Sequence, residues 1–143
     1  MLIKKMSRRD IYHSAARKAL EKDGWQITDD PLDLTIGDVE LLADLGAERL
    51  IAAEKDNEKI AVEIKSFLGQ SLVSEFHKAL GQYENYRLSL EELDPQRNIW
   101  LAISREVWES FFQRAFIQKA IQRYKIEIIV LNTETEEIES WIK

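Results

Sequence analysis

Two apolar runs, Arg49-Leu-Ile-Ala-Ala-Glu-Lys55 and Lys59-Ile-Ala-Val-Glu-Ile-Lys-Ser66, decide the fold. Both are rich in Ile, Val and Ala, and the Asp56-Asn57 pair between them is a strong hairpin signal. The sequence therefore predicts two antiparallel strands joined by a tight turn. Because side chains alternate along a strand, Glu63 and Lys65 point to the same face. A carboxylate and an ammonium thus lie side by side in an apolar strand.

Helical periodicity predicts three helices around this hairpin. Ser7 can cap the first, which Gly24 ends, and Ser71 can cap a long second helix that runs to about Glu92. The third covers residues 105–123 and carries an aromatic face. Apolar stripes on all three indicate that each packs one side against a core.

Further strands are predicted between and after the helices, at residues 25–28, 32–36, 98–103 and 125–131, with an edge strand in the acidic tail. Helices alternate with the later strands, which is typical of an α/β sandwich with a mixed sheet and helical crossovers. The chain holds only 5 Gly and 2 Pro and has no linker-like tract. We therefore expect one domain over residues 1–143.

Composition excludes several classes of protein. The chain has 143 residues, 45% of them apolar, which is enough for one core. Zero cysteines exclude disulfide scaffolds, cysteine-ligated zinc, iron–sulfur clusters and thiol nucleophiles. No apolar run approaches the roughly 18 residues of a membrane span, and no signal-peptide core follows the basic start. A cytoplasmic protein with no membrane association is expected.

Charge is distributed unevenly. The net charge is −6, which argues against non-specific coating of nucleic acid. Residues 1–22, however, carry seven basic and two acidic side chains. This excess is either a phosphate-binding arm or ordinary solubilising charge. Any DNA contact is therefore expected to be weak, or to depend on a metal ion or a partner protein.

The constellation that could do chemistry centres on the second strand. Asp44, nineteen residues before Glu63, offers a second carboxylate that could meet Glu63 and Lys65. Two carboxylates and a lysine are what metal-assisted phosphodiester hydrolysis requires, with Mg²⁺ or Mn²⁺ as the hard cation. Gln82 and Tyr86 are four residues apart, so they face one direction on a helix and could reach a metal-bound water or a phosphate.

Each of these residues also has an ordinary structural interpretation. Glu-x-Lys is common on the charged face of a half-exposed strand, and Asp44 could bond backbone amides in a turn. His13 lies at the rim of the first helix's apolar face, where a histidine is either a packed core residue or a functional one. Several aromatic residues lie at core spacing and are expected in the core: Tyr83, Trp100, Trp108, Phe111 and Phe112.

The motif set resembles a known superfamily. Asp44, Glu63-x-Lys65 and Gln82-x-x-x-Tyr86 are similar to the signature of the PD-(D/E)xK restriction-endonuclease-like superfamily. Nearly the whole chain resembles the XisH family of excision controlling factors, known from cyanobacteria. The matching stretches are Asp10-Ile-Tyr-His13, Ala19-Leu-Glu-Lys-Asp-Gly-Trp25, Ile27-Thr-Asp-Asp-Pro31, Ala43-Asp-Leu-Gly-Ala-Glu48, Ala61-Val-Glu-Ile-Lys-Ser-Phe67 and Ala79-Leu-Gly-Gln-Tyr83.

This resemblance implies a restriction-endonuclease-like core and a role in programmed DNA excision during heterocyst development, together with a site-specific recombinase and a companion protein, XisI. It also implies that Asp10 or Glu21 could supply the extra first-helix carboxylate that some superfamily members use. The alternative for that pair is a solvated helix face.

Two hypotheses follow. In the first, the protein is a metal-dependent DNA endonuclease or nicking factor. Asp44, Glu63 and the Ile64 carbonyl would hold the metal, Lys65 would orient the attacking water, and Gln82 with Tyr86 would support it. In the second, the protein is a non-catalytic module on the same scaffold that regulates the recombinase by binding XisI or by forming a homodimer.

Overall fold

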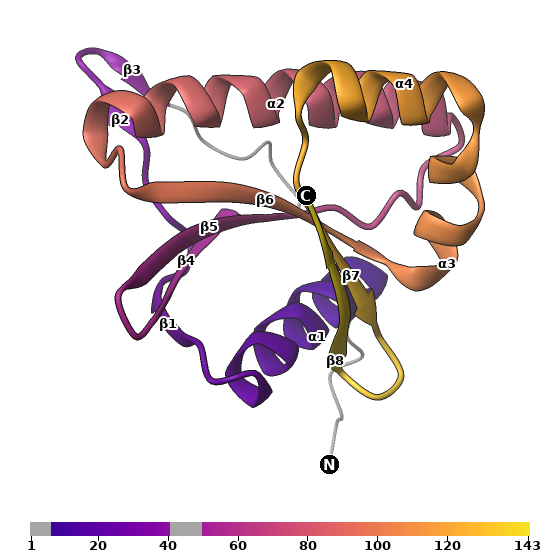
Figure 1. Ribbon diagram of the computed structural model, residues 1–143, viewed down its shortest axis with the longest axis horizontal. Helices are drawn as coiled ribbons and strands as arrows, with labels where there is room; N and C mark the ends of the chain where they lie inside the picture. Colours follow the sequence, from indigo (N-terminus) through magenta and orange to yellow (C-terminus); the bar gives the residue numbers. More distant parts are fainter. Residues whose placement is uncertain (1–6, 41–49) are drawn as a thin grey trace.

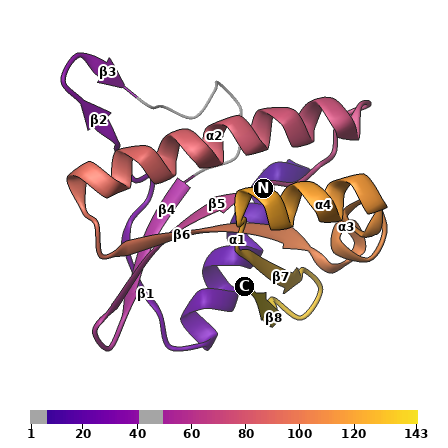
Figure 2. The ribbon, with the colours of Figure 1, turned by 45° about the horizontal axis from the view of Figure 1, so that its top comes forward.

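A six-stranded mixed sheet with helices on both faces forms the centre of the computed structural model, which describes residues 7–40 and 50–143 (Figures 1 and 2). β5, β6 and β7 are parallel, and every other neighbouring pair in this sheet is antiparallel. The α/β class and the mixed sheet are thus confirmed. The strands, in spatial order, are β1 (Gln26–Asp29), β4 (Leu50–Lys55), β5 (Glu58–Ile64), β6 (Arg97–Ser104), β7 (Ile128–Asn132) and β8 (Glu137–Ile142).

The predicted hairpin is β4 with β5. The two strands pair without a shift from Leu50 opposite Glu63 to Lys55 opposite Glu58. Asp56 takes a positive φ of 55° in the turn, a conformation that Asp tolerates better than most residues. The hairpin turn therefore lies at one end of the sheet, and Glu63 lies near the other.

Helices cover the two faces of the sheet separately. α1 (Arg8–Lys22) packs on one face, and α2 (Leu72–Leu93) and α4 (Ala115–Tyr124) lie on the opposite face, as Figure 1 shows. Alternation along β5 divides its residues between two cores: Val62 packs on the α1 side and Ala61 on the α2 side. The strand is buried on both faces, which explains its nearly continuous apolar sequence.

Both predicted helix caps are confirmed. The Ser7 hydroxyl accepts a hydrogen bond of 3.1 Å from the Asp10 N–H, and the Asp10 carboxylate in return accepts from the Ser7 N–H, which completes a capping box. The Ser71 hydroxyl accepts from the Ser74 N–H at 3.2 Å and starts α2. Each cap satisfies amides that have no partner within the helix.

The prediction of one helix over residues 105–123 is wrong. The segment divides into α3 (Arg105–Glu109), a 3₁₀ turn η1 (Phe111–Gln113) and α4. Phe111 and Phe112 are adjacent yet only 2% and 0% exposed. A continuous α-helix would point them about 100° apart, whereas the break lets both pack against Phe67.

Two predicted strands also have different bounds. The strand expected at 125–131 begins only at Ile128, because Lys125 takes a left-handed conformation with φ 52° and ends α4. The strand expected at 32–36 is reduced to β2 (Thr35–Ile36), which pairs with β3 (Val39–Glu40) in a small separate hairpin around Gly37. This hairpin lies beside α2, outside the main sheet (Figure 2).

Among the described helices α2 is the longest, at 22 residues. Its apolar stripe faces the core, and acidic and basic side chains occupy much of the remainder. In the part of the chain that the structure describes, we find no helix with both the length and the apolar character needed to cross a membrane.

Candidate functional site

The charged residues at the carboxyl end of β5 meet a side chain of α2. The Lys65 ammonium lies 3.6 Å from a carboxylate oxygen of Glu63 and donates a hydrogen bond to the side-chain oxygen of Gln82. Glu63 is 2% exposed and Lys65 is 8% exposed. The structure therefore brings three of the predicted residues together, with the lysine between a carboxylate and an amide. We call these three residues the β5–α2 cluster.

Strand geometry explains why these side chains meet α2. Glu63 and Lys65 alternate with Ile64, whose side chain is buried in the core on the α1 side. Lys65 lies one residue beyond β5, but its N–H still donates to the Ala102 carbonyl of β6 at 3.1 Å. The parallel ladder thus fixes the backbone of the lysine, and α2 supplies Gln82 directly over it.

The backbone carbonyl of Ile64 has a defined direction. The peptide between Ile64 and Lys65 is trans, so its C=O points opposite to its N–H. Because the N–H points to β6, the Ile64 carbonyl points toward the β4 side. Its role as a metal ligand stays a prediction.

Tyr86 follows Gln82 by one turn of α2. Its side chain is 4% exposed and packs in the core between the sheet, α2 and α4. The tyrosine and the glutamine therefore share a helix, but the tyrosine ring is part of the apolar core. A catalytic role for Tyr86 also stays a prediction.

Asp44, the second predicted carboxylate, lies outside the described residues. Within residues 7–40 and 50–143, no group of three or more His, Asp or Glu side chains is placed to hold a metal ion. Glu63 contributes a single carboxylate to the cluster, and the neighbouring ammonium offsets its charge. A divalent cation here would need the further acidic ligand that Asp44 was predicted to provide.

His13 belongs to a different cluster. Its Nε2 lies 2.8 Å from Oδ2 of Asp30, and Arg17 donates to the same oxygen at 2.6 Å. His13 and Arg17 lie on α1, which covers the opposite face of the sheet from Gln82. The structure thus does not place His13 with the predicted site.

Asp30 is a residue that sequence reasoning missed, because the Asp-Asp-Pro stretch was interpreted only as a turn. Its side chain is 7% exposed and anchors the end of β1 to α1. The available signal was an acidic residue directly before the turn proline, with a histidine and an arginine one helical turn apart upstream.

The basic charge of α1 is largely engaged within the protein. Lys18 lies 3.3 Å from a carboxylate oxygen of Glu136, in the turn between β7 and β8. Lys22 donates to the Thr135 carbonyl oxygen at 2.6 Å. The basic helix therefore packs beside part of the acidic tail, and these two lysines are not presented as a separate phosphate-binding arm.

The two first-helix carboxylates have structural partners on α1 or at its N-cap. Asp10 completes the capping box with Ser7, and Glu21 lies 3.8 Å from Arg17, four residues earlier.

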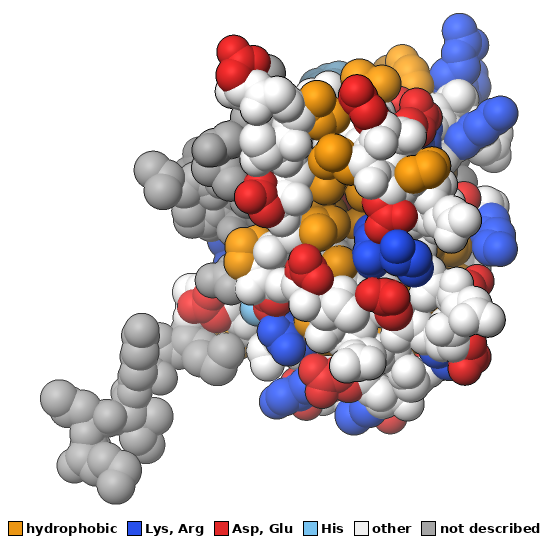
Figure 3. Space-filling model, turned by 90° about the vertical axis from the view of Figure 1, so that its left-hand side faces the viewer, with side chains coloured by type: hydrophobic (Ala, Val, Ile, Leu, Met, Phe, Trp, Pro, Cys, Tyr) orange, Lys and Arg blue, Asp and Glu red, His pale blue; other side chains and the backbone are white. Residues whose placement is uncertain are grey.

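On the face shown in Figure 3, acidic and basic side chains are interspersed around a central apolar area. The described residues on this face thus form no continuous basic surface for DNA.

Comparison with known proteins gives a consistent result. The sequence profile of a protein family described as "XisH protein" matches residues 6–139 of this chain. Among curated proteins no match was found. A crystal structure of an XisH family protein from Nostoc punctiforme PCC 73102 is similar, with 44% sequence identity, a TM-score of 0.87, and coverage of 94% of this chain and 100% of that one.

A second crystal structure is of a fdxN element excision controlling factor protein from Anabaena variabilis. It is 45% identical to this chain, with a TM-score of 0.86, and the match covers 94% of this chain and 99% of that one. A match over 94% of this chain includes most of the six-stranded sheet and of the helices that cover it.

Proposed function

The chain belongs to the XisH family, and from this premise we propose that it acts as an excision controlling factor for a DNA element. It would work with a site-specific recombinase and an XisI-like companion protein. The near full-length similarity to an excision controlling factor supports this assignment.

The proposed chemical role concerns the β5–α2 cluster. Together with Asp44 it would form a phosphodiester site on a restriction-endonuclease-like core. The observation that carries this proposal is that Lys65 contacts both Glu63 and Gln82 at the end of one strand. Lys65 would offset phosphate charge, and Gln82 would hold the lysine in place. Mg²⁺ or Mn²⁺, held by Asp44, Glu63 and the Ile64 carbonyl, would supply Lewis-acid chemistry to the phosphate.

Metal binding and DNA nicking test this role directly. Calorimetric titration with Mn²⁺ should show saturable binding for the wild type and at least about tenfold weaker binding for Asp44→Ala and Glu63→Gln. Nicking of supercoiled plasmid in Mg²⁺ should be lost in Lys65→Met. Glu92→Gln removes an exposed carboxylate from α2 and should leave both activities unchanged. A wild type that binds neither metal would refute the proposed site.

A second candidate function is a non-catalytic regulator of the recombinase. The observation that favours it is the burial of Glu63 and Lys65 against one another, which is how a structural ion pair is arranged. This candidate expects a stable complex with the XisI-like companion, or a homodimer, that persists in Lys65→Met. If the complex requires Lys65 while nicking is absent, both functions as stated are incorrect.

A further inference from the structure

A hollow lies at the opposite end of the sheet from Glu63, beside the β4–β5 turn. Its volume is about 530 Å³, within the range of ligand sites. The hairpin turn, the end of α1, the starts of β6 and β7 and the end of β8 all contribute to it. None of the residues of the β5–α2 cluster lines it. We call this hollow the tryptophan pocket.

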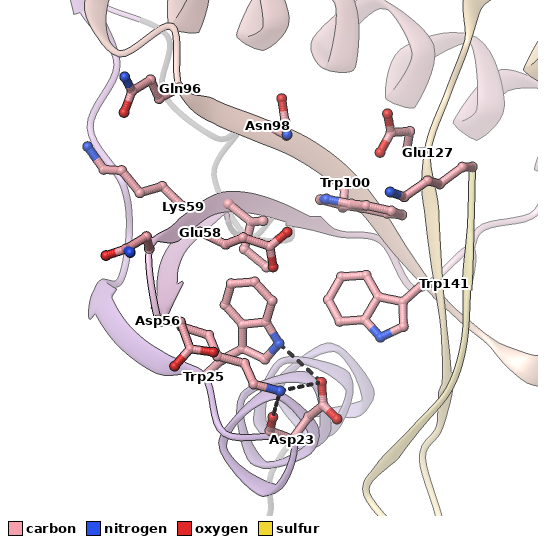
Figure 4. Close-up of a pocket in the computed structure, with 14 residues that line it drawn as sticks. Asp23, Trp25, Asp56, Glu58, Lys59, Gln96, Asn98, Trp100, Glu127 and Trp141 are labelled. Atoms are coloured by element: carbon pink, nitrogen blue, oxygen red, sulfur yellow. Dashed lines mark hydrogen bonds and ion pairs between the residues drawn. The ribbon is translucent and has the colours of Figure 1, made fainter.

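Three of the four tryptophans of the chain lie in this pocket. The Trp141 ring lies 4.9 Å from Trp100, edge to face, and 5.7 Å from Trp25, centroid to centroid. Figure 4 shows the three indoles grouped together among the lining residues. Trp25 and Trp100 are 6% and 5% exposed, so neighbouring residues cover most of their rings, whereas Trp141 is half-buried and presents part of its ring to the hollow. The accessible face of an indole attracts cations.

The pocket already holds one cation against an indole. The Lys55 ammonium lies 6.0 Å from the Trp25 ring centroid. It donates to the Asp23 carbonyl oxygen at 2.6 Å and lies 3.8 Å from the Asp23 carboxylate. The fold thus combines an ammonium, an indole and a carboxylate at this border, which is the chemistry that recognises a cationic ligand.

The remaining lining charges are mainly negative. Lys59 is paired with Asp94, which is not a lining residue, at 2.9 Å. Among the described residues, the carboxylates of Asp56, Glu58 and Glu127 have no ion pair. Lys143 is the lining cation that likewise has no ion pair in the described part of the chain. Three carboxylates with one ammonium leave the pocket suited to positive charge.

We propose that the tryptophan pocket binds the guanidinium group of an arginine side chain from a partner protein. A planar guanidinium can stack on the half-buried Trp141 ring and donate hydrogen bonds from its edge to a carboxylate, and Glu58 and Glu127 flank the indoles (Figure 4). Asp56, Glu58 and Asn98 are exposed, so the hollow opens to the surface and an extended residue from a larger molecule can enter. This inference does not depend on the β5–α2 cluster or on its proposed chemistry.

Tryptophan fluorescence provides the test, because three of the four indoles report on the pocket. The probes are an acetyl-Gly-Arg-Gly-amide peptide, the same peptide with citrulline, which is the neutral isostere, and N-acetyl-arginine amide. The arginine peptide should produce a saturable change. The citrulline peptide should bind at least about tenfold more weakly, because it lacks the charge. Equal binding of the two peptides would overturn the proposal.

Substitutions locate the site. Glu58→Gln combined with Glu127→Gln should weaken binding of the arginine peptide at least about tenfold. Glu92→Gln, on the exposed surface of α2, should bind as the wild type does. Circular dichroism checks that each variant remains folded. Unchanged affinity in the folded double variant would overturn the assignment.

The size of the ligand distinguishes an arginine of a partner protein from a free, small guanidinium compound. Tighter binding of the peptide than of N-acetyl-arginine amide, by about threefold or more, supports a partner protein. Equal affinity for both would overturn the partner-protein assignment. A dissociation constant of 10 mM corresponds to about −3 kcal/mol of binding free energy. No fluorescence change with any probe up to about 10 mM would overturn the site itself.

Discussion

At the carboxyl end of β5 the charged side chains are buried and bonded to one another, whereas at the amino end of the same strand they are exposed around an aromatic hollow. Glu63 is 2% exposed and lies 3.6 Å from Lys65. Glu58 is exposed and has no ion pair among the described residues. The two glutamates are five positions apart in one strand, so environment and not residue type determines what each can do.

This difference has an energetic meaning. A buried charge that loses its partner carries the full cost of desolvation. An exposed carboxylate is already hydrated, and it remains available to a ligand from outside. The closed end should therefore respond strongly to substitution in stability, and the open end should respond in binding.

The largest effect is expected for Glu63→Gln. The change leaves the Lys65 ammonium buried without its carboxylate, and breaking a buried pair costs about 3–5 kcal/mol of unfolding free energy. Urea denaturation measures this loss. Glu58→Gln is the matched control on the same strand and should change stability by less than about 0.5 kcal/mol. Similar losses in the two variants would contradict the contrast between the ends.

Removing both charges sharpens the same comparison. Glu63→Leu with Lys65→Met should recover most of the stability lost in Glu63→Gln, because apolar residues of similar size avoid the desolvation cost. If the double variant is less stable than Glu63→Gln, the ion pair is not the source of the loss.

Asp30→Ala should have the next largest effect, a loss of about 2–3 kcal/mol in unfolding free energy. His13 and Arg17 both bond to one oxygen of this carboxylate, and the change removes the link between β1 and α1. The neighbouring Asp29→Ala alters an exposed side chain of β1 and serves as the control in the same thermal denaturation. Equal melting temperatures for the two variants would argue against this link.

Tyr83→Phe tests the hydrogen bonds that join α2 to the sheet and should cost about 1–2 kcal/mol of unfolding free energy. The Tyr83 hydroxyl donates to the Ile99 carbonyl oxygen at 3.0 Å and accepts from the Glu127 N–H at 3.0 Å. The phenylalanine variant leaves the buried Ile99 carbonyl and the part-buried Glu127 N–H without this partner.

Burial also raises the pKa of Tyr83 above its ordinary value of 10.0. The folded state thus holds the phenol proton more tightly than the unfolded state does. This contribution to stability is complete below pH 10 and is lost as the pH rises through the raised pKa. Above pH 10 the wild type should therefore lose stability more steeply than Tyr83→Phe. Parallel curves would count against burial of this phenol.

The smallest effect is expected for Asp94→Asn, below about 1 kcal/mol, because the Lys59–Asp94 pair is partly exposed. The hydrogen bond from Lys59 lowers the pKa of Asp94 below its ordinary value of 3.8. Its contribution is present above that value and is lost as the pH falls through the lowered pKa. Stability measured down to pH 2 should fall less steeply in the variant, and an unchanged acid limb would show that the pair is weak.

Periodicity and turn chemistry were sufficient to predict α1, α2 and the β4–β5 hairpin, because each depends on residues close in sequence. The break at Ser110 was not predictable in this way. It arises because Phe111 and Phe112 both pack into a core whose other members come from distant segments. Tertiary packing overrode the local helical pattern.

The β5–α2 cluster was partly predictable, since Glu-x-Lys in a strand fixes two side chains on one face. That Gln82 lies over this face depends on the packing of α2 on the sheet. The tryptophan pocket was not predictable: Trp25, Trp100 and Trp141 are far apart in sequence, and they meet only because the sheet packs around α1 on this face. Asp44 lies outside the described residues, and its predicted role stays a prediction.

The two outer strands determine how a second copy of the chain could approach. β1 has only four residues and a register irregularity between Ile27 and Asp29, and β8 carries a similar irregularity opposite Val130 and Leu131. Short or irregular outer strands resist the addition of further strands. Self-association by continuing the sheet from one molecule to the next is therefore disfavoured. The homodimer of the second hypothesis, if it forms, should meet through its helical faces and leave each sheet six strands wide.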